Sequence, residues 1–271
     1  MAKWFGRSKS RGNDKAGDAA ESEHLEPLGV SDDLRLAYGR TGDPKLLRGS
    51  MQAAELAVEV YPVTDVRHAA ALSSLCMLHR LSWERDHGTA DLVKAIDYGR
   101  QAVDKSPPGD PELSRHMSSL ATALQEAYDR TEDEESIDEA IALYRGCLDL
   151  MPKGGSAAQV EQRVGQVSNL ANSLLRKGRK SRDGDTLDEA VQHARAALRD
   201  TPDDHPMHAV RLVNLGGVLL GLVQTGHPEH IAEAEDMYTQ GLRELPAGHP
   251  AHDGVRQTLA MILGLRVQFG I

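Results

Sequence analysis

Five prolines recur at a nearly constant distance in this 271-residue sequence, and their spacing limits what the chain can fold into. Successive prolines are 45, 45, 50 and 44 residues apart. Each one closes a helical apolar pattern, and proline ends a helix because it lacks an N–H group and clashes with the preceding turn. A long fixed period is typical of arrays in which each unit packs only on its neighbours. The prolines are Pro62, Pro107, Pro152, Pro202 and Pro246.

Each unit contains two helical segments. A leucine follows most of the closing prolines by about 13 residues and marks the first segment. The gap is longer only after Pro152, where the sequence "KGGSAAQ" indicates a flexible insertion. The leucines are Leu75, Leu120, Leu170, Leu215 and Leu259.

The second segment carries apolar or small residues at steps of three, four and three, which lie on one face of a helix. A small residue in second place lets two helices approach closely. The four sets are Leu92, Ala95, Gly99 and Ala102; Ile137, Ala140, Tyr144 and Cys147; Leu187, Ala190, Ala194 and Ala197; and Ile231, Ala234, Tyr238 and Gly241.

The spacing of Ala140, Tyr144, Cys147 and Pro152 resembles the second-helix signature of the tetratricopeptide repeat (TPR), and "NLG" at 214–216 resembles its first-helix signature. The unit is longer here, and the additional residues extend the first helix by whole turns. "YDRTEDEESIDEAIALYRGCLDLMP" is similar to the long-unit arrays common in actinobacteria. The resemblance implies a helical solenoid that binds other proteins.

We therefore predict an all-α fold, an α-solenoid of about five antiparallel helix pairs plus a C-terminal capping helix. The repeat domain should span residues 29–271, after a disordered tail, basic and then acidic, over residues 1–28. Helices are expected at 31–40, 44–60, 68–86, 90–105, 112–130, 134–150, 157–178, 185–200, 206–224, 228–244 and 251–268.

Composition and charge narrow the function. A formal net charge of −10 argues against nucleic acid as a partner, because phosphate binding needs clustered cations. Cys76 and Cys147 both fall inside apolar helical patterns, which favours free thiols in a reducing compartment and a cytoplasmic protein. No nucleophile or acid–base constellation is evident, so we expect neither enzymatic activity nor a cofactor. Trp4 and Phe5 lie among basic residues, but this apolar part is short for membrane contact.

Three "HPxH" sequences suggest metal binding, since residues three apart on a helix can meet one ion. Their positions in the repeat favour a structural role, because Asp110 and Asp43 occupy the equivalent sites before a proline. A polar N-cap followed by proline is a helix-start signal. We therefore interpret the histidines as caps or loop residues and expect no metal. The pairs are His205 with His208, His227 with His230, and His249 with His252.

The resemblance also places a partner. In TPR domains the first helices line the concave surface, and positions two before and two, five and six after the signature leucine point into it. Ser73, Ser118 and Ser168 stand where chaperone-tail receptors place cations, so a carboxylate clamp is disfavoured. Arginines could hold an extended acidic peptide instead. The groove residues that we expect to carry binding are Met77, Arg80, Arg115, Thr122, Gln125, Glu126, Asn172, Arg176, Val213 and Leu220.

Two functions remain open. The first is a non-enzymatic adaptor, scaffold or regulatory subunit that grips a peptide or helix in this groove. The second is a self-assembly module, because the segment 206–224 is apolar on nearly every face and must be covered by the terminal helix, by a partner or by a second copy. The basic sequence "RKGRKSR" at 176–182 ends a first helix, where cations complement the helix dipole.

Overall fold

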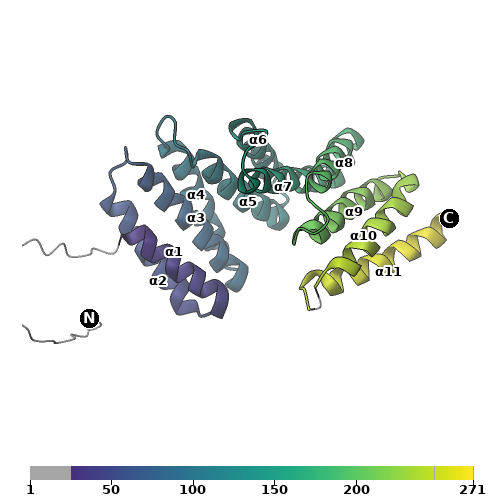
Figure 1. Ribbon diagram of the computed structural model, residues 1–271, viewed down its shortest axis with the longest axis horizontal. Coiled ribbons are helices and arrows are strands. Elements are labelled where there is room, and N and C mark those ends of the chain that lie inside the picture. The colour runs from purple at the N-terminus through teal and green to yellow at the C-terminus, as the bar shows by residue number, and fades with distance from the viewer. Residues whose placement is uncertain (1–25, 247, 271) are drawn as a thin grey trace, which may run out of the picture.

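The computed structural model describes residues 26–246 and 248–270, and within these ranges the chain is helical without any strand. Figure 1 shows the helices arranged as an arch, with α1–α4 in one arm, α5–α8 at the crown and α9–α11 in the other arm. The helices are α1 (Pro27–Thr41), α2 (Pro44–Val60), α3 (Val66–Asp86), α4 (Thr89–Lys105), α5 (Leu113–Thr131), α6 (Glu134–Leu150), α7 (Ala157–Ser181), α8 (Gly184–Arg199), α9 (His208–Gln224), the short 3₁₀ helix η1 (Pro228–His230), α10 (Ile231–Glu244) and α11 (Ala251–Phe269).

Consecutive helices pack as five pairs, α1 with α2 through to α9 with α10, and each pair packs on the next. Contacts between helices far apart in the chain are minor, so the architecture is a solenoid in which each unit is stabilised by its neighbours. The predicted all-α solenoid is confirmed. α11 packs mainly on α10 and has no second helix after it within the described residues.

Helix starts follow from local sequence. The side chain of Asp43 accepts a hydrogen bond from the Lys45 N–H at 2.9 Å, and Asp65 does the same for Arg67. Ser156 and Gln159 form a capping box at the start of α7. These caps satisfy N–H groups that a helix leaves without an internal partner.

The first helices α1, α3, α5 and α7 end in a left-handed residue, which is glycine only after α1. The residue is Gly42 after α1, but His87, Glu132 and Arg182 after α3, α5 and α7, with φ of 54–55°. Glycine relieves the Cβ strain of this conformation, whereas the other residues adopt it at a cost. The turn geometry is therefore imposed by packing as well as by the turn residue.

The core runs along the array where the repeat pattern placed it. The signature leucines Leu75, Leu120, Leu170 and Leu215 are buried, and Ala95, Ala140, Ala190 and Ala234 are fully buried. Close approach explains the small residues, since a Cβ added to Gly99 would lie 3.0 Å from Leu120 Cδ1. Cys76 and Cys147 are buried free thiols, and burial raises the pKa of each to about 12.

Some helix boundaries differ from expectation. α1 begins at Pro27, inside the segment expected to be a tail, and the tail before residue 26 lies outside the described residues. α7 continues to Ser181 because its basic end still forms helical hydrogen bonds. α9 begins at His208, after an irregular turn that contains Pro206. The tenth helix is preceded by the 3₁₀ turn η1.

The apolar helix α9 is buried by its own repeat neighbours. Its contacts come chiefly from α7, α8 and α10, whereas α11 packs on α10. Of the covers considered for this segment, the terminal helix is therefore not the one that the structure shows. Leu220 is only 5% exposed and belongs to the core. Nothing in this arrangement supports self-assembly through the fifth unit, because its apolar side chains are already covered.

Candidate binding groove

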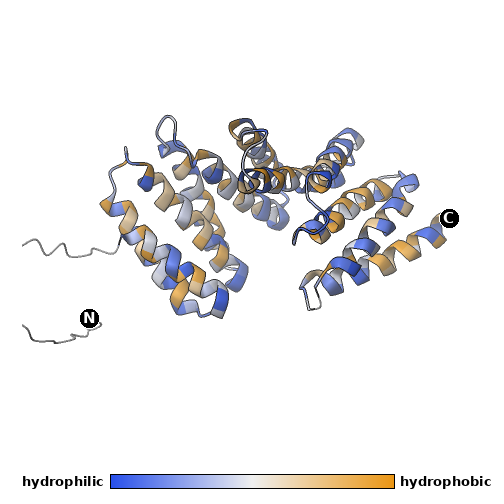
Figure 2. Ribbon diagram, viewed as in Figure 1, coloured by the Kyte–Doolittle hydropathy of each residue, from blue (hydrophilic) through white to orange (hydrophobic). Residues whose placement is uncertain are grey.

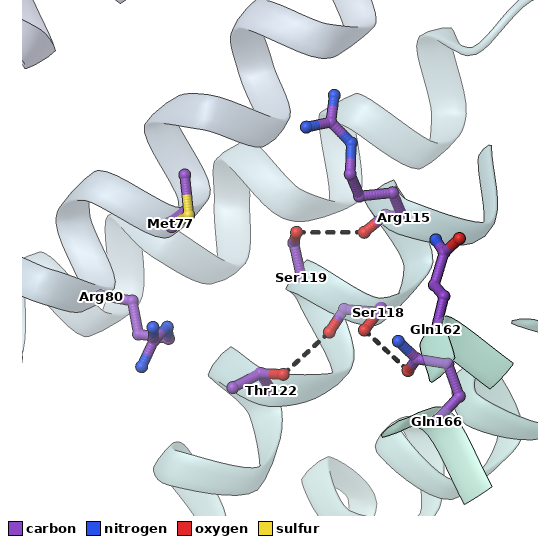
Figure 3. Close-up of a pocket in the computed structure, with 8 residues that line it drawn as sticks. All are labelled: Met77, Arg80, Arg115, Ser118, Ser119, Thr122, Gln162 and Gln166. Atoms are coloured by element: carbon purple, nitrogen blue, oxygen red, sulfur yellow. Dashed lines mark hydrogen bonds between the residues drawn. The ribbon is translucent and has the colours of Figure 1, made fainter. Parts of the chain in front are cut away.

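A small pocket lies where three first helices, α3, α5 and α7, come together (Figure 3). It encloses about 150 Å³. In Figure 3 the α3 and α7 side chains stand on opposite sides of α5. The lining residues are Met77 and Arg80 from α3, Arg115, Ser118, Ser119 and Thr122 from α5, and Gln162 and Gln166 from α7.

The floor of the pocket is neutral and polar. Ser118 Oγ donates to Gln166 Oε1 at 2.8 Å, and Thr122 Oγ1 lies 2.9 Å from the phenol oxygen of Tyr144. Tyr144 is fully enclosed, and burial raises its pKa to about 12, so the phenol stays neutral. Amides and hydroxyls of this kind can pair with a peptide backbone, which offers one donor and one acceptor per residue.

Arg80, on the α3 side of the pocket, is held in an ion-pair network. Its Nη1 lies 2.8 Å from Glu126 Oε1 across the seam between α3 and α5, and it also pairs with Glu84 one turn along α3. Burial raises the pKa of the Glu126 carboxyl, against the opposing effect of Arg80. Arg80 therefore already neutralises carboxylates of the chain itself.

The other two predicted arginines are paired as well. Arg115 Nε lies 2.7 Å from Glu112 Oε2, with both side chains about half exposed. Arg176 Nε lies 2.8 Å from Asp129 Oδ1 on α5. Each of the three arginines expected in the groove is thus paired with a carboxylate of the chain, and Arg115 is the most exposed of the three.

The pocket opens where the repeat is least regular. α3 packs directly on α5 and α7 packs directly on α9, but α5 and α7 make no comparable contact. The longer connection between Met151 and α7 separates these units. A second cavity of about 170 Å³ shares Arg115 and Gln162 with the pocket and continues to Pro152. We call the pocket and this extension the α5–α7 groove.

The structure brings together some of the predicted groove residues. Met77, Arg80, Arg115 and Thr122 line the pocket, whereas Glu126 contributes through its bond to Arg80. The others lie elsewhere on the first helices. Gln125, Asn172 and Val213 are half-buried, Arg176 lines a separate pocket at the ends of α5 and α7, and Leu220 is buried in the core.

Three lining residues were missed by counting from the signature leucines. Ser119, Gln162 and Gln166 lie outside the expected positions. Conversely, Ser73 and Ser168 were expected to face the groove but are buried. Ser168 Oγ instead accepts a hydrogen bond from Asn214 Nδ2 at 3.0 Å, across the seam to α9.

A further pocket, of about 290 Å³, lies at the basic end of α7. Two of its lining cations are paired with carboxylates, Arg176 with Asp129 of α5 and Lys180 with Glu132, which directly follows α5. Lys177, on the same turns of α7, lies 2.6 Å from Asp138 of α6. These cations occupy the last turns of the helix, as predicted from the helix dipole.

In two of the three histidine pairs, the first histidine accepts a backbone hydrogen bond in the turn that precedes a helix. His205 Nδ1 accepts from the Met207 N–H at 3.2 Å and His249 Nδ1 from the Ala251 N–H at 3.1 Å. Asp110 makes the same bond to Glu112. His227 differs, since its side chain caps no backbone group and contacts the Glu229 carboxylate. No group of three or more His, Cys, Asp or Glu residues within the described ranges could hold a metal ion.

Across residues 26–246 and 248–270, no helix combines the length and apolar character needed to span a bilayer.

Comparisons with known proteins identify the fold. The chain is similar to kinesin light chain-like TPR repeats of Podosopora anserina, with 15% identity and a TM-score of 0.58, over 80% of this chain and 98% of that one. It is also similar to a thermophilic TPR protein of Thermus thermophilus, with 17% identity and a TM-score of 0.54, over 88% and 97% of the two chains. No protein family matches the sequence, and no curated protein matches it. The chain therefore has a TPR-type repeat fold.

Proposed function

We propose that this chain is a non-enzymatic adaptor or scaffold that holds a segment of another protein in the α5–α7 groove. TPR-type folds generally bind other proteins or peptides, and the groove is the place where this one departs from regular packing. The observation that carries the proposal is the pocket in which Ser118, Thr122 and Gln166 form a neutral polar floor beside Arg115. Two buried free thiols favour action in the cytoplasm.

The chemistry of the groove favours an extended peptide over a helix. Hydroxyl and amide groups suit the regularly spaced N–H and C=O groups of an extended backbone, which a helix keeps for itself. Among the arginines expected to face the groove, Arg115 is the most exposed, so an acidic side chain of the ligand would pair there. Arg80 serves the α3–α5 seam and supports the wall of the pocket.

The test uses peptides as the probe. Peptides selected from a random phage-displayed library on the full chain should bind the wild type, and binding should be lost in the double variant Arg115→Glu, Gln162→Trp. The reversed charge repels an acidic ligand, and the indole fills the groove. Both positions are exposed, so the melting temperature should hardly change.

The control is a charge reversal at the end of α7, with Lys177, Arg179 and Arg182 each changed to Glu. This variant should keep the selected peptides. Binding that survives the groove variant but is lost in the control would move recognition to the basic end of α7. If both variants bind like the wild type, the proposal is wrong.

A further inference from the structure

One face of α11 carries apolar side chains on which no other helix packs in the described part of the chain. Leu263 and Val267 lie four residues apart on this face, and they are 55% and 83% exposed. Figure 2 shows the apolar stretches of α11 at the end of the arch. A helix that closes a solenoid ordinarily presents a polar outer face, whereas the outer face of α11 is partly apolar.

The same face is covered in the earlier units. Counted from the signature leucine, the positions of Ala260, Leu263 and Val267 correspond to Gly216, Leu219 and Val223 in α9. Those residues are buried in the pair that α9 forms with α10. The equivalent residues of α5 (Ala121, Leu124 and Tyr128) and of α7 (Ala171, Leu174 and Gly178) are also buried. α11 therefore has the surface on which a second helix of the repeat packs.

The face of α11 also has the features of a second helix. Ala260 and Gly264 are four residues apart, like Ala95 and Gly99 of α4. A Cβ added to Gly99 would lie 3.1 Å from Cys76 Sγ, whereas one added to Gly264 would meet nothing within 4 Å. One helix surface thus combines the large residues of a first helix with the small residues of a second.

We infer that α11 of a second copy of this chain occupies this face, in an antiparallel pair about a two-fold axis between residues 261 and 262. This pairing sets Leu263 of each copy on Ala260 of the other. In both halves of the pair a large side chain thus faces a small one, as self-complementary packing requires.

Charge favours the same arrangement. The chain has a formal net charge of −10, which opposes association of two copies through most surfaces. On α11, Arg266 is paired with Glu235 of α10, and the remaining charged side chains, Asp253 and Arg256, sum to zero, so the repulsion between two copies is smallest at this helix. In the antiparallel pair Arg256 lies beside Val267 of the second copy, in the last turn of that helix. The negative end of the helix dipole is located there, so the contact is attractive.

The expected dimer is weak. A single helix pair buries less than the roughly 1,200 Å² of total surface that stable interfaces need, so the equilibrium should be concentration-dependent. The surface lies on α11, whereas the α5–α7 groove lies on α3, α5 and α7. Dimerisation and peptide binding are therefore separate properties that can fail independently.

Sedimentation equilibrium of the full chain, from low micromolar to several hundred micromolar, tests the inference. The wild type should change reversibly from monomer to dimer. Leu263→Glu and Val267→Arg should each weaken dimerisation at least about tenfold. The first variant places a carboxylate in an apolar contact, and the second places a cation beside Arg256 of the other copy. The matched control is Val93→Glu on α4, where valine is 58% exposed and lies outside the proposed pairing face, and its dimerisation should equal that of the wild type.

Disulfide cross-linking tests the geometry separately. A mixture of Ala260→Cys and Leu263→Cys chains should form a mixed disulfide faster than either variant alone forms a disulfide with itself. Only in the mixture does the antiparallel pair place two thiols opposite each other. The native cysteines are buried. A monomer across the whole concentration range overturns the inference. So does a dimer that the α11 variants leave unchanged, or cross-linking in which the mixture has no advantage.

Discussion

The second helices and the first helices join their neighbours in different ways. Along the second helices one ion pair recurs at every described seam from α4 to α10. In each pair the arginine directly follows the third residue of a second-helix set, such as Gly99 of α4. The glutamate directly precedes the second residue of the set in the next unit, such as Ala140 of α6. The pairs are Arg100 with Glu139 at 2.5 Å, Arg145 with Glu189 at 2.6 Å and Arg195 with Glu233 at 2.8 Å.

Along the first helices each seam is different. Ser73 contacts Ser119 between α3 and α5, Ser118 bonds to Gln166 between α5 and α7, and Asn214 bonds to Ser168 between α7 and α9. The same ion pair thus recurs in one register along the second helices, whereas the contacts between first helices differ from seam to seam. The groove that we propose for recognition lies on the first helices.

The largest effect should come from disturbing the close packing of the second helices. Ala190 is fully buried in α8, and Ala190→Leu should lower the free energy of unfolding by about 1–3 kcal/mol through overpacking. Thermal and urea unfolding measure the change. The control is Gln192→Leu, an exposed position on the same helix, which should stay within about 0.5 kcal/mol of the wild type. Equal behaviour of the two variants would mean that the small residues do not set the helix spacing.

A smaller effect should come from the first-helix network. Arg80→Leu leaves Glu126 half-buried without its cation and should cost about 1–2 kcal/mol near pH 8. Burial already raises the pKa of Glu126 in the folded state, so the folded chain binds its proton more readily than the unfolded chain. Stability from this group therefore falls as pH rises through that raised pKa.

Accordingly, the destabilisation by Arg80→Leu relative to the wild type should shrink as pH is lowered. Adding Glu126→Gln should recover much of the loss at pH 8, because the neutral amide removes the uncompensated charge. Urea unfolding of the wild type and both variants at several pH values measures this. A cost that does not depend on pH would assign the role of Arg80 to packing alone.

The smallest effect should come from the ion pairs of the second helices. Arg145 is 52% exposed, so reversing it to Glu should cost no more than about 0.5 kcal/mol. The charge swap Arg145→Glu, Glu189→Arg should restore most of that loss. The coupling energy of this double-mutant cycle should decrease in about 1 M salt, where exposed charges are screened. Zero coupling at low salt would remove the pair as a determinant of register.

Helix positions were predictable from the sequence because their signals are local. Asp43 and Asp133 cap helices, proline ends each second helix, and the small residues mark the closely packed face. Boundaries were missed where a tertiary feature decides them. Gly88 precedes α4 and Gly184 begins α8, but the left-handed residues are His87 and Arg182, because helix packing fixes which residue must turn.

The groove was less predictable, because counting from the leucine assumes a constant relation between units. Gln166 occupies a position that is buried in other units, as Ala71, His116 and Arg211. Gln166 reaches the pocket because α5 and α7 do not pack closely on each other. The only signal was the lengthened gap after Pro152. The ion pair between Arg80 and Glu126 could have been predicted, because the two residues are about one repeat apart and so lie at neighbouring positions of adjacent first helices.

The weak contact between α5 and α7 also has a mechanical consequence. A solenoid deforms like springs joined in series, so its overall bending is greatest at the most compliant junction. Among the junctions between the second and fifth units, α5 and α7 make the fewest first-helix contacts, so we expect bending of the arch to concentrate between the third and fourth units. A peptide held in the groove would bridge this junction. Its binding would set the angle between the two arms, and tension on the arms would change the affinity of the groove.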